Sequence, residues 1–544
     1  MPFNSTAFLV FFIIVYAVYR LLPHRAQNVF LLLASYVFFG WWDIRFLFLI
    51  IFSTCLDFIC GLMIADGQIP GKKRWGVSAT VVLSALVFMV IPWELLSRPG
   101  STLKSLVQGF FDWNFRWLIL AATVLLVLAF NTWYPRLVNL ESQKRRKLFL
   151  MLSLTGNLGI LGLFKYFNFF LENLESLARG LGLNPAHLHL NIVLPVGISF
   201  YTFMTLSYTI DLYKGRLGPA RIFHEYALFV AFFPKLLAGP IERARNFLPQ
   251  IEAKRIIQTD QIVQGLQEIV YGLFKKIVVA DGLAASVSGV FAGTYQLSWA
   301  DAVLGTLFFT IQIYCDFSGY SDIATGISRL LGFNLMRNFN FPYFSRNPSE
   351  FWNRWHISLS SWFRDYIFFP LGGPYGTTFR WIRNVLITFF ITGLWHGAAW
   401  NFVFWGLYYG VLLCLHRIRE SLRKSRKRSK NALKKAVSIF FFFILINLGW
   451  VLFRAHSMGQ ALDIFKVLFR DFGNLKLNAA MPTEAAMLGL PVFIIIEFLG
   501  NRARGKRLDE VFPLPVWTAA YAAMLFLIIL GLSNVPAGFI YFVF

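Results

Sequence analysis

Two histidines in a strongly apolar chain are the residues best suited to chemistry. His356 lies in FWNRWHISLSSWFRDYIFFPLGG at 351–373, and His396 lies in GLWHGAAWNF at 393–402. An imidazole can take a proton from a hydroxyl near neutral pH, and the activated hydroxyl can attack a thioester or ester carbonyl. Polar neighbours that could orient the first histidine or hold an anionic group are Asn353, Arg354, Arg364 and Asp365. We therefore predict a general-base site.

Other roles for these histidines are structural or metal-binding. Each ring could cap a helix or bond a backbone carbonyl inside a helical bundle. A zinc site is disfavoured, because no HExxH motif is present and no Cys or Glu stands three or four positions from either histidine. The sequence also lacks a phosphate-binding loop and a dinucleotide fingerprint. We expect neither a metal nor a bound cofactor.

The composition is that of a membrane protein. The 544 residues are 57% hydrophobic and 14% charged, whereas a soluble domain carries about 25% charged residues. The net charge of +24 comes from Lys and Arg gathered in short loops between apolar runs, the positive-inside pattern, so we predict no nucleic-acid partner. The four cysteines lie in apolar runs without CxxC spacing and are expected to be buried and unpaired.

The apolar runs predict an all-α polytopic membrane protein with about 11–14 transmembrane helices plus re-entrant segments. The N-terminus lacks a basic region and a cleavage site and is expected to be a retained span. Basic residues follow the first, third and fifth of the first six runs, which predicts an outside N-terminus. These six runs are 3–22, 29–43, 44–64, 75–95, 115–134 and 148–170.

We predict that residues 1–544 form a single membrane-embedded domain. Ten Lys/Arg and one Glu between Arg417 and Lys435 predict a basic cytoplasmic loop at 416–435. The same alternation places the tail at 535–544 outside the cytoplasm. The run 384–415 is too long for one crossing, so we predict two crossings with a turn near 396–401.

Ionisable residues occur in two further apolar stretches. Asp316 and Asp322 belong to the polar island YCDFSGYSDIATG, which could line a reaction tunnel or an ion path, or simply bond between helices. Lys235 lies in FFPKLLAGPIERAR, a re-entrant or in-plane candidate. It could meet a phosphate-bearing donor at the inner face, or anchor the segment at the interface.

These motifs resemble those of the membrane-bound O-acyltransferases. The two histidine motifs, FPKLLAGPI at 233–241 and QIYCDFSGYSDIATGISRLLGFNLMRNFNFPY at 312–343 occur in family order, within a core at 190–410. They are similar to the bacterial branch that acetylates alginate, cellulose or peptidoglycan or transfers D-alanine to teichoic acid. The resemblance implies helices around a central tunnel, with His396 the essential residue and His356 the second.

The ending FIYFVF at 539–544 resembles that of some members of this branch. There, a tyrosine is proposed to carry the acyl group before a secreted transferase takes it, so the resemblance implies that Tyr541 receives the acyl group with His396 as base. The alternative is an aromatic interfacial anchor. The implied partners are membrane lipid, an acyl thioester donor such as acetyl-CoA, and a periplasmic or extracellular SGNH-type acetyltransferase.

We therefore expect a multi-pass O-acyltransferase of a bacterial inner membrane that serves O-acetylation of an exported polysaccharide. One alternative is transfer of D-alanyl or another acyl group to a cell-wall polymer. Others are a proton-coupled transporter using Asp316, Asp322 and the histidines, and a scaffold of a polysaccharide secretion machine. The predicted substrate-binding residues are Asn353, Arg354, Arg364, Asp365, Asp316 and Lys235.

Overall fold

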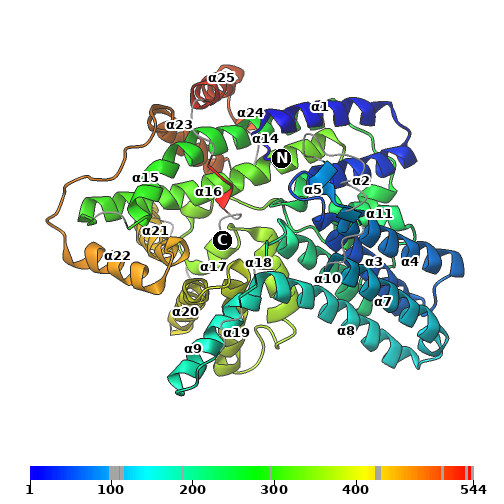
Figure 1. Cartoon of the computed structure of the whole chain (residues 1–544). Helices are drawn as coiled ribbons and strands as arrows, with labels where there is room; N and C mark the ends of the chain where they lie inside the picture. Colours follow the sequence, from blue (N-terminus) through cyan, green and yellow to red (C-terminus); the bar gives the residue numbers. More distant parts are fainter. Residues whose placement is uncertain are drawn as a thin grey trace. The chain divides into compact units, whose positions relative to one another are not determined.

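The protein is described by a computed structural model in which every regular element of the described residues is a helix (Figure 1). This confirms the all-α class. Two compact units are distinguished: unit 1 is Met1–Leu237 with Ile241–Ile256, and unit 2 is Ala238–Pro240 with Ile257–Phe544. The predicted single domain over 1–544 stays a prediction. The described residues are 1–96, 109–110, 115–185, 189–190, 192–293, 296–422, 431–503, 508–532 and 537–540.

Unit 1 is built around buried α3. Its Asp57 accepts hydrogen bonds from Ser153 (2.6 Å) and Asn157 (3.0 Å) of α8, so polar side chains join the two helices inside an apolar unit. The elements are α1 (Thr6–Leu21), α2 (His24–Gly40), α3 (Phe46–Ala65), α4 (Gly71–Ala85), η1 (Leu86–Val90), α5 (Trp93–Leu96), α7 (Phe115–Val138), α8 (Ser142–Leu161), η2 (Gly162–Tyr166), α9 (Phe167–Gly180), α10 (Ile198–Tyr213), α11 (Phe223–Ala231), α12 (Phe233–Leu236) and α13 (Ala244–Glu252).

Unit 2 holds both histidines. Its elements are α14 (Thr259–Leu273), η3 (Phe274–Ala280), α15 (Asp281–Phe291), α16 (Trp299–Leu330), η4 (Pro342–Phe344), α17 (Pro348–Trp352), α18 (Ile357–Phe363), η5 (Arg364–Phe368), α19 (Thr378–His396), α20 (Trp400–Leu422), α21 (Ala432–Arg454), α22 (Met458–Arg470), α23 (Glu484–Arg502), α24 (Leu508–Val511) and α25 (Leu514–Gly531).

The long helix α16 packs against α14 through paired glycines. A Cβ on Gly326 would lie 2.4 Å from the carbonyl oxygen of Gly265, and one on Gly319 would lie 2.8 Å from that of Gly272. Each helix repeats its glycine after two turns, so both contacts lie on one face. Small residues let the two backbones touch, as in tightly packed membrane helices.

Eight described helices are long and apolar enough to cross a membrane. Several predicted spans form shorter helices, with 16 residues in α1, 17 in α2 and 16 in α10. The stretch 350–373 contains α17, α18 and the π-helix η5, which have five, seven and five residues, so none of them can cross a bilayer. The predicted turn near 396–401 is confirmed, because α19 ends at His396 and α20 begins at Trp400.

Candidate active site

His356 occupies a strained position between α17 and α18. Its φ of 42° lies in the left-handed region, which costs a non-glycine residue about 1–3 kcal/mol. The flanking backbone is held, since the N–H of Ile357 donates to the carbonyl of Asn338 (2.8 Å) and the carbonyl of His356 accepts from Ser360 (2.9 Å). Such strain is a feature of functional sites.

The side chain of Asn338 sets the tautomer of His356. Its Oδ1 lies 3.3 Å from His356 Nδ1 and accepts a bond from the Ser358 hydroxyl at 2.6 Å, while its Nδ2 donates to Ser321 Oγ on α16 at 3.1 Å. Because the amide oxygen can only accept, Nδ1 must carry the proton. Nε2 of the neutral ring then carries the lone pair and has the character of a base.

Aromatic rings surround this imidazole. The centroids of Phe317, Phe339 and Trp395 lie 4.6, 6.3 and 6.4 Å from that of His356, which is fully buried. Burial lowers the pKa of His356, which lies in the loop between α17 and α18, to about 3. The ring is therefore neutral at physiological pH, as a general base must be.

His396 lies at the end of α19 in a second group of aromatic rings. Its centroid is 4.9 Å from Trp395, 4.8 Å from Trp405 of α20 and 5.3 Å from Phe453 of α21. Trp395 thus contacts both imidazoles, and the structure brings the two predicted histidines to one indole.

The glycines of the His396 motif let α20 approach α19. A Cβ on Gly393 would lie 2.3 Å from the carbonyl oxygen of Phe402, and one on Gly397 would lie 2.2 Å from the Phe402 ring. From the α20 side, a Cβ on Gly406 would lie 2.2 Å from the carbonyl oxygen of Phe389. The motif therefore has a packing role that brings Trp405 of α20 to His396.

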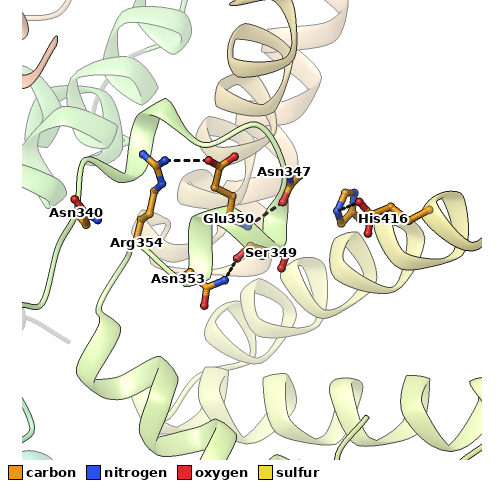
Figure 2. A pocket seen from close by; sticks show the side chains of 8 residues that line it. Asn340, Asn347, Ser349, Glu350, Asn353, Arg354 and His416 are labelled. Atoms are coloured by element: carbon orange, nitrogen blue, oxygen red, sulfur yellow. Dashed lines mark hydrogen bonds and ion pairs between the residues drawn. The ribbon is translucent and has the colours of Figure 1, made fainter. Parts of the chain in front are cut away.

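Two of the polar residues predicted around His356 line a cavity of about 400 Å³. Arg354 pairs with Glu350 at 2.9 Å, and Asn353 Nδ2 donates to the carbonyl of Ser349 at 2.9 Å. Both interactions are drawn in Figure 2. The other lining residues are Asn340, Asn347, His416 and Glu420.

The remaining predicted binding residues have other partners. Arg364 pairs with its neighbour Asp365 at 2.9 Å, with half of the arginine side chain exposed. Asp316 pairs with Lys276 at 2.7 Å. Lys235, in unit 1, is fully buried between the rings of Phe229 and Phe247, 4.3 and 4.1 Å from their centroids.

Lys235 was predicted to meet a phosphate-bearing donor at the inner face or to anchor its segment at the interface, and this role stays a prediction. In the structure its ammonium group lies against two phenyl rings inside unit 1.

Comparison with known proteins decides the family. Residues 222–452 match the model of MBOAT, the membrane-bound O-acyltransferase family. The chain is 34% identical over 509 residues to the probable alginate O-acetylase AlgI of Pseudomonas aeruginosa, an alignment that covers 92% of this chain and 82% of the relative. This chain belongs to the membrane-bound O-acyltransferase family.

Two further relatives of this acyltransferase carry different names. The peptidoglycan O-acetyltransferase of Helicobacter pylori is 36% identical over 348 residues, which is 59% of this chain and 64% of the relative. The teichoic acid D-alanyltransferase of Bacillus subtilis is 29% identical over 284 residues, which is 49% of this chain and 71% of the relative. The protein is therefore a multi-pass membrane enzyme, an O-acyltransferase, rather than the transporter or scaffold considered from the sequence.

A second cavity of this acyltransferase, of about 380 Å³, is bounded by Asn338, the residue that holds His356. Its charged lining residues include Lys275, Arg329, Arg337, Glu268, Asp322 and Glu497. The cavity therefore carries three cationic and three acidic groups beside the residue that orients the imidazole, and Arg329 pairs with Glu268 at 2.9 Å.

Sequence reasoning missed the residues that connect the site. Asn338 stands inside one of the family motifs, in RNFNFPY, but nothing local in that stretch pairs it with a histidine 18 positions away. Ser358 and Trp395 lie within two residues of the histidines, but neither was predicted as a site residue. Tyr541 lies outside the described residues.

Proposed function

We propose that this acyltransferase takes an acetyl group from a cytoplasmic thioester, acetyl-CoA, and passes it across the inner membrane for O-acetylation of an exported polysaccharide. The relatives named as alginate O-acetylases support acetyl as the group and a polysaccharide as the acceptor, because they match over about nine-tenths of this chain. The D-alanyltransferases match only about half of it.

The observation that carries the proposal is the buried, neutral His356, oriented by Asn338 and sharing an indole with His396. His396 takes the proton of the acceptor hydroxyl while His356 supports the reacting group as the second imidazole. The hydroxyl oxygen forms a bond to the acyl carbon, the carbon–sulfur bond breaks, and the proton passes to the departing thiolate.

The thioester donor occupies the cavity bounded by Asn338. Arg329 and Arg337 line that cavity, and the charge pattern of the loops supports a cytoplasmic position for both. Such cations suit the phosphate groups of a coenzyme A thioester. Other proposed contacts of the donor are Asn353 and Arg354, which line a cavity together with His416 and Glu420. The ion pair of Arg364 with Asp365 is also a proposed contact.

Tyr541 is the proposed first acceptor. It follows Ile540 directly, and Phe539 and Ile540 are both buried. The Phe539 ring lies 6.1 Å from that of Phe317, which lies 4.6 Å from His356. This placement supports a relay over an interfacial anchor. An aryl ester is activated enough for a hydroxyl of a secreted SGNH-type acetyltransferase to take the acetyl group onward to the polysaccharide.

The test uses membranes containing the full chain, labelled acetyl-CoA, and the secreted transferase with its polysaccharide. His396→Ala should lower acetylation by about 10²–10⁴-fold, the contribution of a general base, at unchanged protein level. Tyr541→Phe should abolish transfer to the polysaccharide. His456→Ala, at an exposed histidine before α22, is the matched control and should retain activity.

Full acetylation by His396→Ala would contradict the base assignment. Full acetylation by Tyr541→Phe would remove the relay and leave the acyltransferase with a direct acceptor.

A further inference from the structure

The described tail of the chain, residues 537–540, is bound by a cluster of three charged side chains of unit 2. Lys276 of η3 pairs with Asp281 at 2.9 Å and with Asp316 of α16 at 2.7 Å. We name these three residues the Lys276 cluster. In Figure 1 the tail, in red, lies beside α16.

Within the described residues 537–540, the cluster's hydrogen bonds to the tail go to backbone groups. Lys276 Nζ donates to the carbonyl oxygen of Ala537 at 3.0 Å, and the N–H of Ile540 donates to Asp316 Oδ2 at 2.7 Å. Charge-assisted bonds of this kind are among the strongest a chain makes.

The π-helix η3 turns this lysine inward. Lys275 and Lys276 follow each other and are both buried. Lys275 donates to Ser318 at 3.0 Å and pairs with Asp322, whereas Lys276 turns to the tail. An inserted residue in a helical turn re-aims side chains in this way, and such turns are frequent at functional sites.

The charge balance of the Lys276 cluster explains why it needs the tail. It holds two carboxylates and one ammonium group, and buried charge is costly unless every group is paired and hydrogen-bonded. The tail supplies an N–H donor to Asp316 and a carbonyl acceptor to the lysine. A buried ion pair adds little stability by itself. Binding of the tail is therefore a better explanation for the presence of these buried charges than a contribution to folding stability.

Phe539 adds an apolar anchor between these polar contacts. Its ring centroid lies 4.9 Å from Tyr320 and 6.1 Å from Phe317, both on α16. Phe317 also contacts His356 at 4.6 Å. The tail is thus fixed to the same face of α16 that supports the imidazole.

We propose that the Lys276 cluster is a clamp that holds residues 537–540 by their backbone on the face of α16 that supports His356, and that the relay at Tyr541 depends on this clamp. The proposal rests on the relay function of Tyr541. It assigns Lys276, Asp281 and Asp316 as positioning residues. Asp316, whose predicted substrate-binding role stays a prediction, accepts the N–H of Ile540 in the tail.

Thiol labelling of the full chain in native membranes tests the clamp without any acyl donor. Ile540→Cys places a thiol at a buried tail position, the buried probe, and Gly538→Cys places one at an exposed position where a Cβ meets no atom within 4 Å, the exposed probe. With a membrane-permeant maleimide, the buried probe should react at least about tenfold more slowly than the exposed probe, because its exposure requires release of a buried charge-assisted bond. The unsubstituted chain gives the background of the four native cysteines, all buried.

Asp316→Leu should abolish this protection. It leaves Lys276 and Asp281 as a one-to-one pair, so no buried charge loses its only partner. The labelling rate of the buried probe should rise about tenfold, toward that of the exposed probe. Asp322→Leu, which breaks the neighbouring lysine pair without touching the tail, is the matched control and should leave the buried probe protected. Equal reactivity of the buried probe with and without Asp316, or equal release by Asp322→Leu, would overturn the clamp.

A change on the tail keeps the test valid if Asp316→Leu fails to fold. With Phe539→Cys supplying the thiol, Ile540→Pro removes the N–H that Asp316 accepts, whereas Ile540→Ala removes the side chain and keeps the N–H. The clamp predicts faster labelling of the Phe539→Cys thiol in the proline variant than in the alanine variant. Equal rates would overturn it.

Polysaccharide acetylation in the same membranes separates the clamp from the relay. Release of the buried probe together with a loss of acetylation supports both. Release with full acetylation would keep the clamp as a structural contact and overturn its role in the relay. Protection that does not depend on Asp316, combined with an inactive Tyr541→Phe, would overturn the clamp and leave the relay standing.

Discussion

At the scale of single residues, the site depends on an asparagine rather than on the charged groups beside the histidine. Asn338 fixes the tautomer of His356 by accepting from Nδ1 and donating to Ser321. Arg354 and Asp365 instead pair with Glu350 and Arg364. A neutral partner suits this role, because a carboxylate in the same place would favour the protonated imidazole.

Asn338→Asp should therefore change the pH dependence of acetyl transfer. The new carboxylate raises the pKa of His356, so the ring becomes protonated and loses its basic lone pair at a higher pH than in the parent. The variant should lose activity as pH falls from about 7 to about 5, the range where an ordinary histidine titrates. The parent ring, with its pKa lowered to about 3, stays neutral throughout that range.

Initial rates of acetyl transfer from about pH 5 to about pH 8 in reconstituted membranes give the measurement. Asn338→Ala serves as the comparison. Its rate should be lower by about 10- to 100-fold, because alanine cannot orient His356. The pH at which activity is lost on the acid side should not rise, because alanine adds no charge. Superimposable profiles for the parent and Asn338→Asp would show that Asn338 does not control the protonation of His356 during acetyl transfer.

At the scale of helices, the close contact of α19 and α20 sets the place of His396. The helices meet through Gly393 and Gly406, where a Cβ on either glycine would collide with the backbone of the opposite helix. Because Trp405 of α20 contacts His396 at the end of α19, a wider spacing would displace the aromatic rings around the imidazole. Helix packing at these glycines therefore controls the surroundings of the proposed base, His396.

Gly393→Ala should destabilise the protein by about 1–3 kcal/mol, the usual cost of forcing an extra methyl into a packed contact. Its Cβ would lie 2.3 Å from the Phe402 carbonyl oxygen, and backbone cannot move aside as a flexible side chain can. Gly159→Ala in α8 is the control, since its Cβ meets no atom within 4 Å. That variant should be neutral or stabilised by about 0.5–1 kcal/mol through helix propensity.

Thermal loss of monodisperse protein in detergent compares the two variants with the parent. Acetyl transfer should fall in Gly393→Ala and not in Gly159→Ala. Equal thermal midpoints for both variants would argue against the close helix contact.

At the scale of the whole molecule, the basic loops predict how the chain lies in its membrane. The ten Lys/Arg between Arg417 and Lys435 favour the cytoplasmic side, and the alternation of spans then places the tail outside. The proposed mechanism requires this arrangement, because the donor would enter near Arg329 from the cytoplasm and the relay at the tail would act on the opposite side of the membrane.

Cysteines at two exposed positions report the sides directly. Ser421→Cys, at the end of α20, should react with a membrane-impermeant maleimide only in inverted vesicles, and Gly538→Cys only in right-side-out vesicles. The expected difference is complete rather than graded, because a charged reagent does not cross the bilayer. Reaction of both cysteines from one side would contradict the predicted topology.

The sequence by itself determined the class, the family motifs and the two histidines. Apolar run length and charge content are local properties, so they identified the all-α membrane protein and the break between α19 and α20. They also marked the short helices around His356 as too polar to face lipid. Span number was less predictable, because several apolar runs fold as helices of 16 or 17 residues.

Only the tertiary structure decided which polar groups meet. The N–H of Ile540 reaches Asp316 across 224 positions, and Asn338 reaches His356 across 18 positions and a helix break. Such pairings follow from how helices cross, and neither periodicity nor local composition records that. The same applies to Lys235, whose burial between two phenyl rings depends on packing within unit 1. Charged residues in apolar runs were identifiable as costly from the sequence, but their partners were set by the fold.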